Sequence, residues 1–255
     1  MDLTNKVVAI TGGGSGIGRA LALTFAKEGA RVACLGRRLA RLQETIHETE
    51  NNSGSGLAVQ TDITDAAQVK NAVAEITEKL GPIEVLFNNA GSFASLGAAF
   101  EIDRDLWWQD VTVNIKGVML MMREVLPQMM ARDSGVIINM NGGRPVGGSG
   151  YAAGKAGMME LTRVASLELQ ELNSNIIILG AGPGLVQTEM TQLQADSKAG
   201  QRWIPSTKKS IDTGTTRSPF DIANKTIEVL KAVKPEWNGK YFGPETDIAE
   251  FDSAD

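Results

Sequence analysis

The chain has one cysteine and one histidine, and this scarcity excludes several kinds of active site. With Cys34 alone, no disulfide can form within the chain, and a zinc site built from Cys and His clusters is excluded. A Ser-His-Asp hydrolase would have to use His47, which lies in a charged helical segment far from any serine elbow. We therefore predict that His47 is a solvated helix residue and Cys34 a core residue, and we expect no metal site.

The sequence also lacks long apolar runs and a dominant charge sign. No apolar stretch approaches the roughly 20 residues that span a bilayer, and residues 1–6 contain no signal-peptide core. The net charge is −5, with 25 basic and 30 acidic residues mixed along the chain, so neither a nucleic-acid tract nor a basic membrane surface is indicated. We expect a cytoplasmic protein whose partners are small molecules, with no nucleic acid and no membrane among them.

Glycine, by contrast, is concentrated where a first strand ends and a helix begins. The apolar run 7–10 stops at Thr-Gly-Gly-Gly-Ser-Gly-Ile-Gly, and apolar residues then recur at helical spacing up to Gly29. Without a Cβ, Gly12, Gly16 and Gly18 allow a tight turn, close approach of a ligand and close packing of the helix on the strand. The free amides and the dipole of the helix N-terminus favour a phosphate, although an ordinary loop would produce a similar pattern.

Strands and helices alternate along the whole chain. Strands are predicted at 7–10, 32–35, 57–61, 83–87, 136–140, 176–179 and 240–242. Helices are predicted from 17 to the stop at Gly29 and at 39–46, 69–80, 106–122, 123–132, 151–172 and 219–233, with a turn at 51–56. This alternation predicts an α/β fold, a single doubly wound, Rossmann-type parallel sheet of about seven strands with helices on both faces. We expect one domain over 1–255.

The polar and glycine-rich segments follow the carboxyl ends of these strands. They are 11–18, 36–38, 62–63, 88–91 and 139–142. Because the strands of a parallel sheet point the same way, these segments gather along one edge, where ligands bind in doubly wound folds.

At this point the chain resembles the short-chain dehydrogenase/reductase family. The motifs Thr-Gly-(x3)-Gly-x-Gly at 11–18, Asn-Asn-Ala-Gly at 88–91, Asn114, Tyr-(x3)-Lys at 151–155 and Pro-Gly-(x3)-Thr at 183–188 match the family's motifs in order. The resemblance covers nearly the whole chain. It implies a nicotinamide-dependent oxidoreductase with a substrate lid at about 185–217. Since the family usually forms dimers or tetramers, it also implies a homodimer or homotetramer.

Tyr151 and Lys155 carry the expected chemistry. Four residues apart on a helix, they lie on one face about one turn from each other. A phenol has a pKa of about 10, and a nearby ammonium is expected to lower it, which makes Tyr151 a usable general acid or base. The resemblance implies that Lys155 also holds the nicotinamide ribose and that Asn114 binds a water in the proton relay.

One position departs from the family's pattern. Where the family ends its fifth core strand with two serines, the second of which binds the substrate carbonyl, this chain has Asn141 and Gly142, and the loop that follows is shorter. Asn141 carries an amide donor that can polarise a carbonyl. Ser149 is the other candidate donor, with loop capping as its alternative role. We expect Gly142→Ser to raise turnover if the site lacks only a donor and if the loop accepts a Cβ.

The end of the second strand indicates the cofactor. An NAD site usually places a carboxylate there, whereas this chain has Gly36 followed by Arg37 and Arg38, which leave room and positive charge for a 2′-phosphate. NADP(H) is therefore favoured over NAD(H), although a solvated basic helix start is the alternative. By resemblance, the cofactor contacts Gly12, Ser15, Gly16, Ile17, Gly18, Arg37, Arg38, Asp62, Ile63, Asn89, Ala90, Gly91, Tyr151, Lys155, Pro183, Gly184 and Thr188.

Two classes of function follow from this reading. The first is an NADP(H)-dependent oxidoreductase that transfers hydride between nicotinamide and a small carbonyl or secondary alcohol, with Tyr151 as general acid/base. The second is an NADP(H)-binding sensor or regulatory protein with little turnover, motivated by the missing serine. An enoyl (C=C) reductase is a third possibility, disfavoured because such relatives often alter the tyrosine motif.

Overall fold

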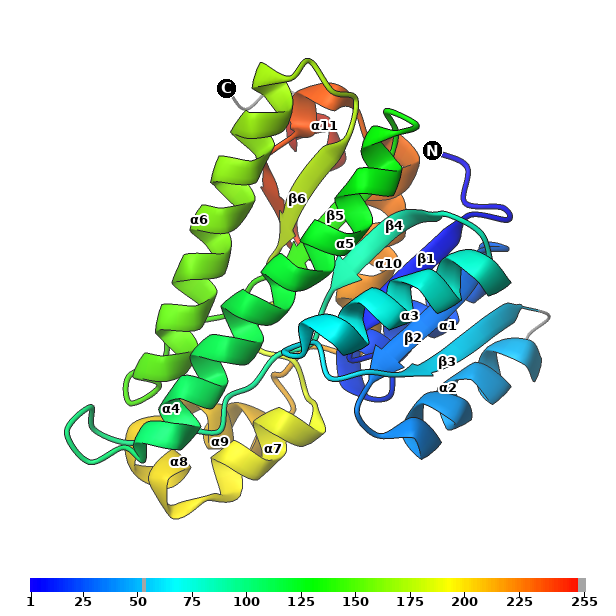
Figure 1. The fold of residues 1–255 in the computed structure, drawn as a ribbon. Helices are drawn as coiled ribbons and strands as arrows, with labels where there is room; N and C mark the ends of the chain where they lie inside the picture. Colours follow the sequence, from blue (N-terminus) through cyan, green and yellow to red (C-terminus); the bar gives the residue numbers. More distant parts are fainter. Residues whose placement is uncertain (52–53, 252–255) are drawn as a thin grey trace.

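A computed structural model describes residues 1–51 and 54–251 of the chain, and its centre is a seven-stranded sheet (Figure 1). The strands, all parallel, are β1 (Val7–Thr11), β2 (Arg31–Gly36), β3 (Ser55–Gln60), β4 (Ile83–Asn88), β5 (Val136–Met140), β6 (Ile177–Ala181) and β7 (Tyr241–Phe242). Their order is β3-β2-β1-β4-β5-β6-β7, so the chain winds outward in both directions from the β1–β4 junction. The predicted fold class is confirmed.

Helices cover both faces of this sheet. One face packs against α1 (Gly16–Lys27), α2 (Leu39–Asn51) and α10 (Pro219–Ala232), and the other against α3 (Ala66–Lys79), α5 (Val118–Met130) and α6 (Ser149–Glu171). The remaining helical elements are α4 (Arg104–Val111), η1 (Thr112–Gly117), α7 (Glu189–Asp196), α8 (Lys198–Trp203), α9 (Pro205–Asp212), η2 (Pro235–Trp237) and α11 (Ile248–Phe251).

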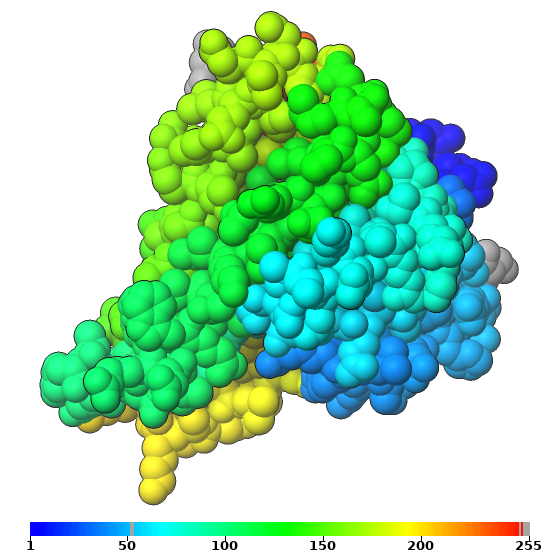
Figure 2. All heavy atoms as spheres, in the orientation of Figure 1, coloured from blue at the N-terminus to red at the C-terminus, as the bar shows by residue number. Residues whose placement is uncertain are grey.

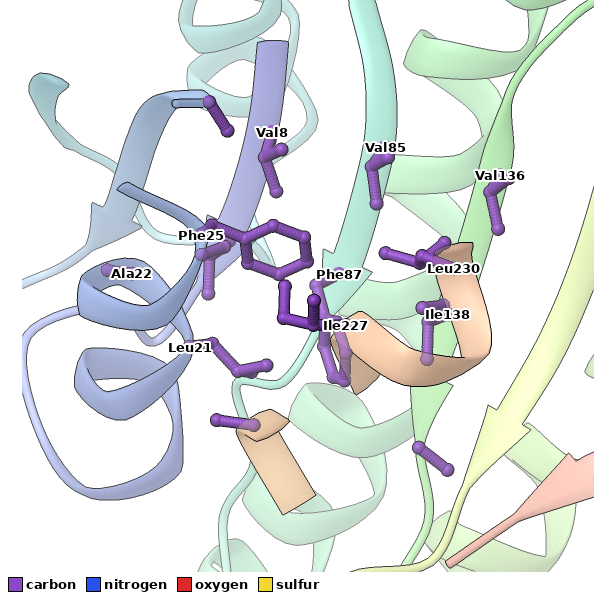
Figure 3. Packing of buried hydrophobic residues seen from close by; sticks show 14 of the residues in the cluster. Val8, Leu21, Ala22, Phe25, Val85, Phe87, Val136, Ile138, Ile227 and Leu230 are labelled. Carbon is purple, nitrogen blue, oxygen red and sulfur yellow. The ribbon is translucent and has the colours of Figure 1, made fainter. Parts of the chain in front are cut away.

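Side chains alternate between the two faces of a strand, so a single apolar run contributes to the cores on both sides of the sheet. Along β1, Val8 and Ile10 enter the core beneath α1 and α10, whereas Val7 and Ala9 enter the core on the opposite face. Figure 3 shows the first of these cores, where the Phe25 ring of α1 lies among side chains of β1, β4 and α10. Because helices cover both faces, the carboxyl edge of the sheet is left to carry the polar loops.

Two predicted regions differ from the observed elements. The break expected between 122 and 123 is absent, and instead α4 continues into α5 through the π-helical turn η1 at Thr112–Gly117. The polar segment after β6 also contains three short helices, α7 to α9, which form the lower end of the molecule in Figure 2 and reach toward the N-terminal part. Part of the turn predicted at 51–56 falls on residues 52 and 53, which lie outside the described residues.

None of the helices within the described residues combines the length and the apolar character needed to cross a bilayer. Over the same residues, no group of three or more His, Cys, Asp or Glu side chains is placed to hold a metal ion.

Candidate active site

A cleft of about 1420 Å³ runs along the carboxyl edge of the sheet. Its walls include most of the residues assigned from the sequence: Gly12, Ser15, Gly16, Ile17, Arg37, Arg38, Asp62, Ile63, Asn89, Ala90, Gly91, Asn141, Tyr151, Lys155, Pro183, Gly184 and Thr188. Two assigned residues, Gly18 and Asn114, do not line it.

The glycine-rich turn takes the backbone form that its composition predicts. Gly12 and Gly16 have φ values of +69° and +50°, a region that L side chains rarely adopt. A Cβ on Gly12 would lie 3.0 Å from Asn89 Nδ2, and one on Gly18 would overlap the carbonyl oxygen of Gly12. Gly18 therefore packs beneath the turn rather than facing the cleft. Ser15 is the N-cap of α1 but makes no capping hydrogen bond with its side chain.

The loop after β4 is fastened to the end of β1. The Thr11 hydroxyl accepts hydrogen bonds from the backbone amides of Asn89 and Ala90, both at 3.0 Å. The Asn89 side chain donates to the carbonyl of Thr11 at 2.9 Å. The Gly-rich turn and this loop thus form one continuous wall.

Cations cluster at the end of β2, as predicted. Arg37 and Arg38 are exposed on the wall of the cleft. Arg41, which was not assigned to the site from the sequence, also lines it. Arg38 and Arg41 both pair with the carboxylate of Glu189 at 3.6 and 3.3 Å. This wall therefore has three guanidinium groups and one carboxylate, which the segment after β6 contributes.

The other residues assigned to the cofactor surround the same cleft. Asp62 accepts hydrogen bonds from the backbone and hydroxyl groups of Thr64, and Ile63 packs under η1, where a Cβ on Gly117 would lie 2.5 Å from it. Thr188 caps α7, and its methyl group lies 3.1 Å from where a Cβ on Gly16 would be. Three features fit a bound dinucleotide: the missing Cβ at Gly16, the positive φ of two glycines, and an α1 N-terminus that no side chain caps.

Tyr151 and Lys155 meet at the inner end of the cleft. Lys155 is only 3% exposed, its Nζ donates to the Met140 carbonyl at 2.7 Å, and it lies 5.8 Å from the centre of the Tyr151 ring. Burial lowers the pKa of Lys155 to about 8. Burial, together with the negative charge of Asp110, raises the pKa of Tyr151 to about 12.

The expectation that the lysine lowers the tyrosine pKa is therefore wrong for this structure. Desolvation of the phenolate is the larger cause, and the charge of the Asp110 carboxylate raises the pKa further. At neutral pH the phenol is protonated, as a proton donor must be, but the raised pKa makes it a weaker acid than a solvated phenol.

Asn114 and Asn141 each hold a buried amide oxygen with no hydrogen-bond partner among the described residues. The Asn114 amide donates to the carbonyls of Ser92 and Asp110 at 2.7 and 2.8 Å, which turns its oxygen toward the space between Gly91 and Lys155. The backbone amide of Asn141 donates to the Ala181 carbonyl at 2.7 Å, which fixes its place at the end of β5. Unpartnered buried oxygens of this kind are where water or a ligand is expected.

The structure corrects the two expectations tied to the missing serine. A Cβ on Gly142 would overlap the Tyr151 hydroxyl, so the loop does not accept a serine there without displacing the tyrosine. Ser149 does not line the cleft; its hydroxyl accepts a hydrogen bond from Trp107 Nε1 at 3.1 Å. Of the two candidate donors, only Asn141 faces the cleft.

Two further side chains of the site were missed from the sequence. Phe93 stacks on the Tyr151 ring, with centroids 4.6 Å apart and an angle of 21° between the rings. Asp110, on α4, is completely buried beside the segment that carries Phe93. The one available signal was the position of Asp110, a carboxylate one helical turn before Asn114.

The sequence model of the family described as short chain dehydrogenase matches residues 6–199, more than half of the chain. The chain belongs to this family. Its members that resemble the chain in sequence and structure are NAD(P)-dependent oxidoreductases, and the chain shares their nicotinamide-binding fold.

Individual relatives agree with this assignment. A short chain dehydrogenase of Pseudocercospora fijiensis is 34% identical over 196 residues, which cover 74% of this chain and 62% of that protein. The 3-oxoacyl-[acyl-carrier-protein] reductase of Thermotoga maritima is 32% identical over 238 residues, covering 91% and 90% of the two chains. A crystal structure of an actinorhodin polyketide ketoreductase variant with NADPH superposes with a TM-score of 0.83 at 26% identity and covers 93% of this chain and 95% of that one.

Proposed function

We propose that this short-chain dehydrogenase reduces a small carbonyl compound with NADPH, or oxidises the corresponding secondary alcohol with NADP⁺. The observation that carries the proposal is the convergence of the Tyr151 hydroxyl, the buried Lys155 ammonium and the Asn141 amide at the inner end of one cleft. The ketoreductases among the relatives support the same class of reaction.

In the proposed reaction, Tyr151 supplies the proton. A nicotinamide held by Lys155, Pro183, Gly184 and Thr188 would supply the hydride for the carbonyl carbon. Tyr151 donates its phenolic proton to the carbonyl oxygen. The ammonium of Lys155, 5.8 Å from the centre of the Tyr151 ring, offsets part of the desolvation that raises the pKa of Tyr151. The free oxygen of Asn114 lies where it can hold a water near Lys155 for the return of the proton.

Asn141 is the proposed second donor to the substrate oxygen. It replaces the family's serine at the end of β5, and its side chain makes no hydrogen bond within the part of the chain that the structure describes. A neutral amide suits this role because it polarises a carbonyl without competing for the proton.

The preference for NADPH rests on the three arginines at the end of β2. Gly36 leaves the ribose side open, and Arg37 carries no ion pair among the described residues, so its guanidinium is available to a 2′-phosphate. We propose that residues 185–217 are the substrate lid, because residues of α7 and α9 line the cleft. We also propose that 1–255 form one domain, because a single sheet joins strands from both halves of the chain.

A panel of ketones, aldehydes and α,β-unsaturated carbonyls, followed by NADPH absorbance, tests this proposal with wild type, Tyr151→Phe and Asn141→Ala. Tyr151→Phe keeps the ring stacked on Phe93 but removes the acidic hydroxyl, so turnover is expected to fall at least about 10²-fold. Asn141→Ala is expected to lower kcat/KM by about 10²- to 10³-fold. NADPH affinity, measured by fluorescence titration, is expected to stay unchanged in both variants.

Full activity in Tyr151→Phe would refute its role as proton donor, and unchanged kinetics in Asn141→Ala would eliminate it as the second donor. The missing serine gives a specific reason to test a second function. Tight NADPH binding without wild-type turnover across the whole panel would favour the NADP(H)-binding sensor.

A further inference from the structure

Asp110 is a buried carboxylate for which the proposed reaction has no direct use. It lies near the end of α4, its side chain is completely buried, and among the described residues no lysine or arginine pairs with it. A buried charge without a cation is strongly unfavourable unless hydrogen bonds replace its water shell. The carboxylate therefore needs several donors close at hand.

Four donors surround it, and all come from one short segment. One oxygen accepts from the Ser92 hydroxyl at 2.6 Å and from the Ala94 amide at 2.7 Å. The other oxygen accepts from the Ser95 hydroxyl at 2.6 Å and from its backbone amide at 2.9 Å. The Asp110 carboxylate thus forms hydrogen bonds to residues on both sides of Phe93.

The backbone of Asp110 extends the same connection to Asn114. Its carbonyl accepts from the Asn114 amide, which also donates to the Ser92 carbonyl. One residue of α4 therefore links the segment 92–95 to the proposed proton relay.

Phe93 transmits this arrangement to the reacting group. The Phe93 ring stacks on Tyr151. A Cβ on Gly148 would lie 2.8 Å from Cε2 and Cζ of the same ring, so the short loop after β5 also packs against Phe93. The Phe93 carbonyl accepts a hydrogen bond from Gln194 of α7 at 2.6 Å. Phe93 is in contact with the tyrosine, the β5–α6 loop and the lid at once.

We propose that Asp110 is a positioning residue, which holds Phe93 against Tyr151 and so fixes the direction of the catalytic phenol. A carboxylate suits this task because it only accepts hydrogen bonds, and here it meets four donors. An asparagine of the same shape would turn its own N–H groups toward the Ser95 amide or the Ser92 and Ala94 donors. The catalytic consequence rests on the proposed function, whereas the placement of Phe93 does not.

The chain's two tyrosines, Tyr151 and Tyr241, make the placement directly measurable. With ¹³C-labelled tyrosine rings, the cofactor-free protein gives two sets of ring signals in NMR spectra, which Tyr241→Phe assigns. The stacked Phe93 ring shifts the Tyr151 signals by its ring current, and Phe93→Leu defines their position without it. In Asp110→Asn we expect the Tyr151 signals to move most of the way to the Phe93→Leu position. Asp105→Asn, the same charge change at an exposed site of α4, is expected to leave them in place.

Kinetics provide the second readout. A displaced phenol is expected to lower kcat about 10- to 100-fold in Asp110→Asn. The dissociation constant of NADPH is expected to stay the same, because no residue of the segment 92–95 is among those assigned to the cofactor. If Asp110→Asn does not fold, Ser95→Ala tests the proposal instead, since it removes one hydroxyl donor and keeps the charge of Asp110. We then expect a smaller shift of the Tyr151 NMR signals, in the same direction.

The proposal would be overturned if the Tyr151 signals keep their wild-type position in folded Asp110→Asn. If that variant does not fold, the same result in Ser95→Ala would overturn it. The NMR measurement requires no turnover, so the two hypotheses fail separately. A displaced Tyr151 signal in a protein that reduces no carbonyl would refute the proposed function and leave the positioning role standing.

Discussion

At the scale of single residues, Gly142 determines where the reacting hydroxyl lies. The Tyr151 oxygen sits against the backbone of Gly142, in the space that any larger residue would fill. Tyr151 and the short loop are thus adapted to the missing side chain, and we propose the neighbouring Asn141 as the donor in place of the one that the family has there.

We therefore expect Gly142→Ser to lower activity, because the gain expected from the sequence required a loop that accepts a Cβ, and this loop does not. The added Cβ forces the Tyr151 hydroxyl away from its position, and a displacement of about 1 Å can cost about 10²-fold in kcat/KM. Gly143→Ser is the matched control, since a Cβ there has open space around it, and it is expected to behave as wild type. Steady-state kinetics on both variants decide; a Gly142→Ser enzyme that is faster than wild type would contradict this placement of Tyr151.

Lys155 makes a second residue-scale prediction, about stability and pH. Its folded pKa of about 8 lies below the usual lysine value, so the folded protein loses this proton before the unfolded chain does. The unfavourable burial of the ammonium is complete below pH 8 and is relieved as pH rises from 8 toward about 10. Urea unfolding of cofactor-free protein at pH 7 and pH 10 should therefore show wild type gaining about 2 to 3 kcal/mol relative to Lys155→Met. A constant difference between the two proteins would show that Lys155 is not desolvated.

At the scale of elements, patterns of period 2 and 3.6 located the sheet and its main helices, because packing on a core imposes those periods. The π-helical turn η1 was not foreseen, since its i→i+5 bonds leave no distinct period in six residues. It matters for the site because it begins just after Asp110 and contains Asn114. The helices α7 to α9 were also missed, because they are short and their apolar residues are few.

The N-terminus of α7 supplies the element-scale prediction. Glu189 pairs with Arg38 and Arg41, and both partners are about half exposed, so each pair contributes at most about 1 kcal/mol. A 2′-phosphate would need these guanidinium groups, so Glu189→Gln is expected to raise NADPH affinity about 2- to 5-fold with NADH affinity unchanged. Asp196→Asn removes the same charge at the other end of α7, where the partner is Lys208, and should alter neither affinity. Equal gains for NADPH and NADH would contradict competition for the arginines.

At the scale of the whole molecule, the doubly wound topology explains why the site was easier to predict than its chemistry. Parallel strands bring segments as distant as 11–18 and 183–188 to one edge, so their residues could be assigned to one cleft from the sequence. Contacts between loops follow no such rule. Motif spacing does not specify the path of each loop. That path determines the stacking of Phe93 on Tyr151, the hydrogen bonds to the Asp110 carboxylate and the close approach of the Tyr151 hydroxyl to Gly142.

The same topology separates a basic wall from an otherwise acidic molecule, and this leads to a prediction for the intact protein. The net charge is −5, yet Arg37, Arg38 and Arg41 gather at the end of β2. A ligand that binds only the folded state stabilises it by RT ln(1 + [L]/Kd), so the dinucleotide with the extra phosphate should raise the melting temperature more.

At equal concentrations we expect NADPH to stabilise the folded protein by about 1.5 to 3 kcal/mol more than NADH does, because a hydrogen-bonded charge contact typically contributes this much. Arg37→Ala should reduce the NADPH shift toward the NADH value while leaving the NADH shift intact. Calorimetric melting of both proteins with each cofactor measures this, and equal shifts for NADPH and NADH in wild type would assign the arginines to the protein surface rather than to a phosphate.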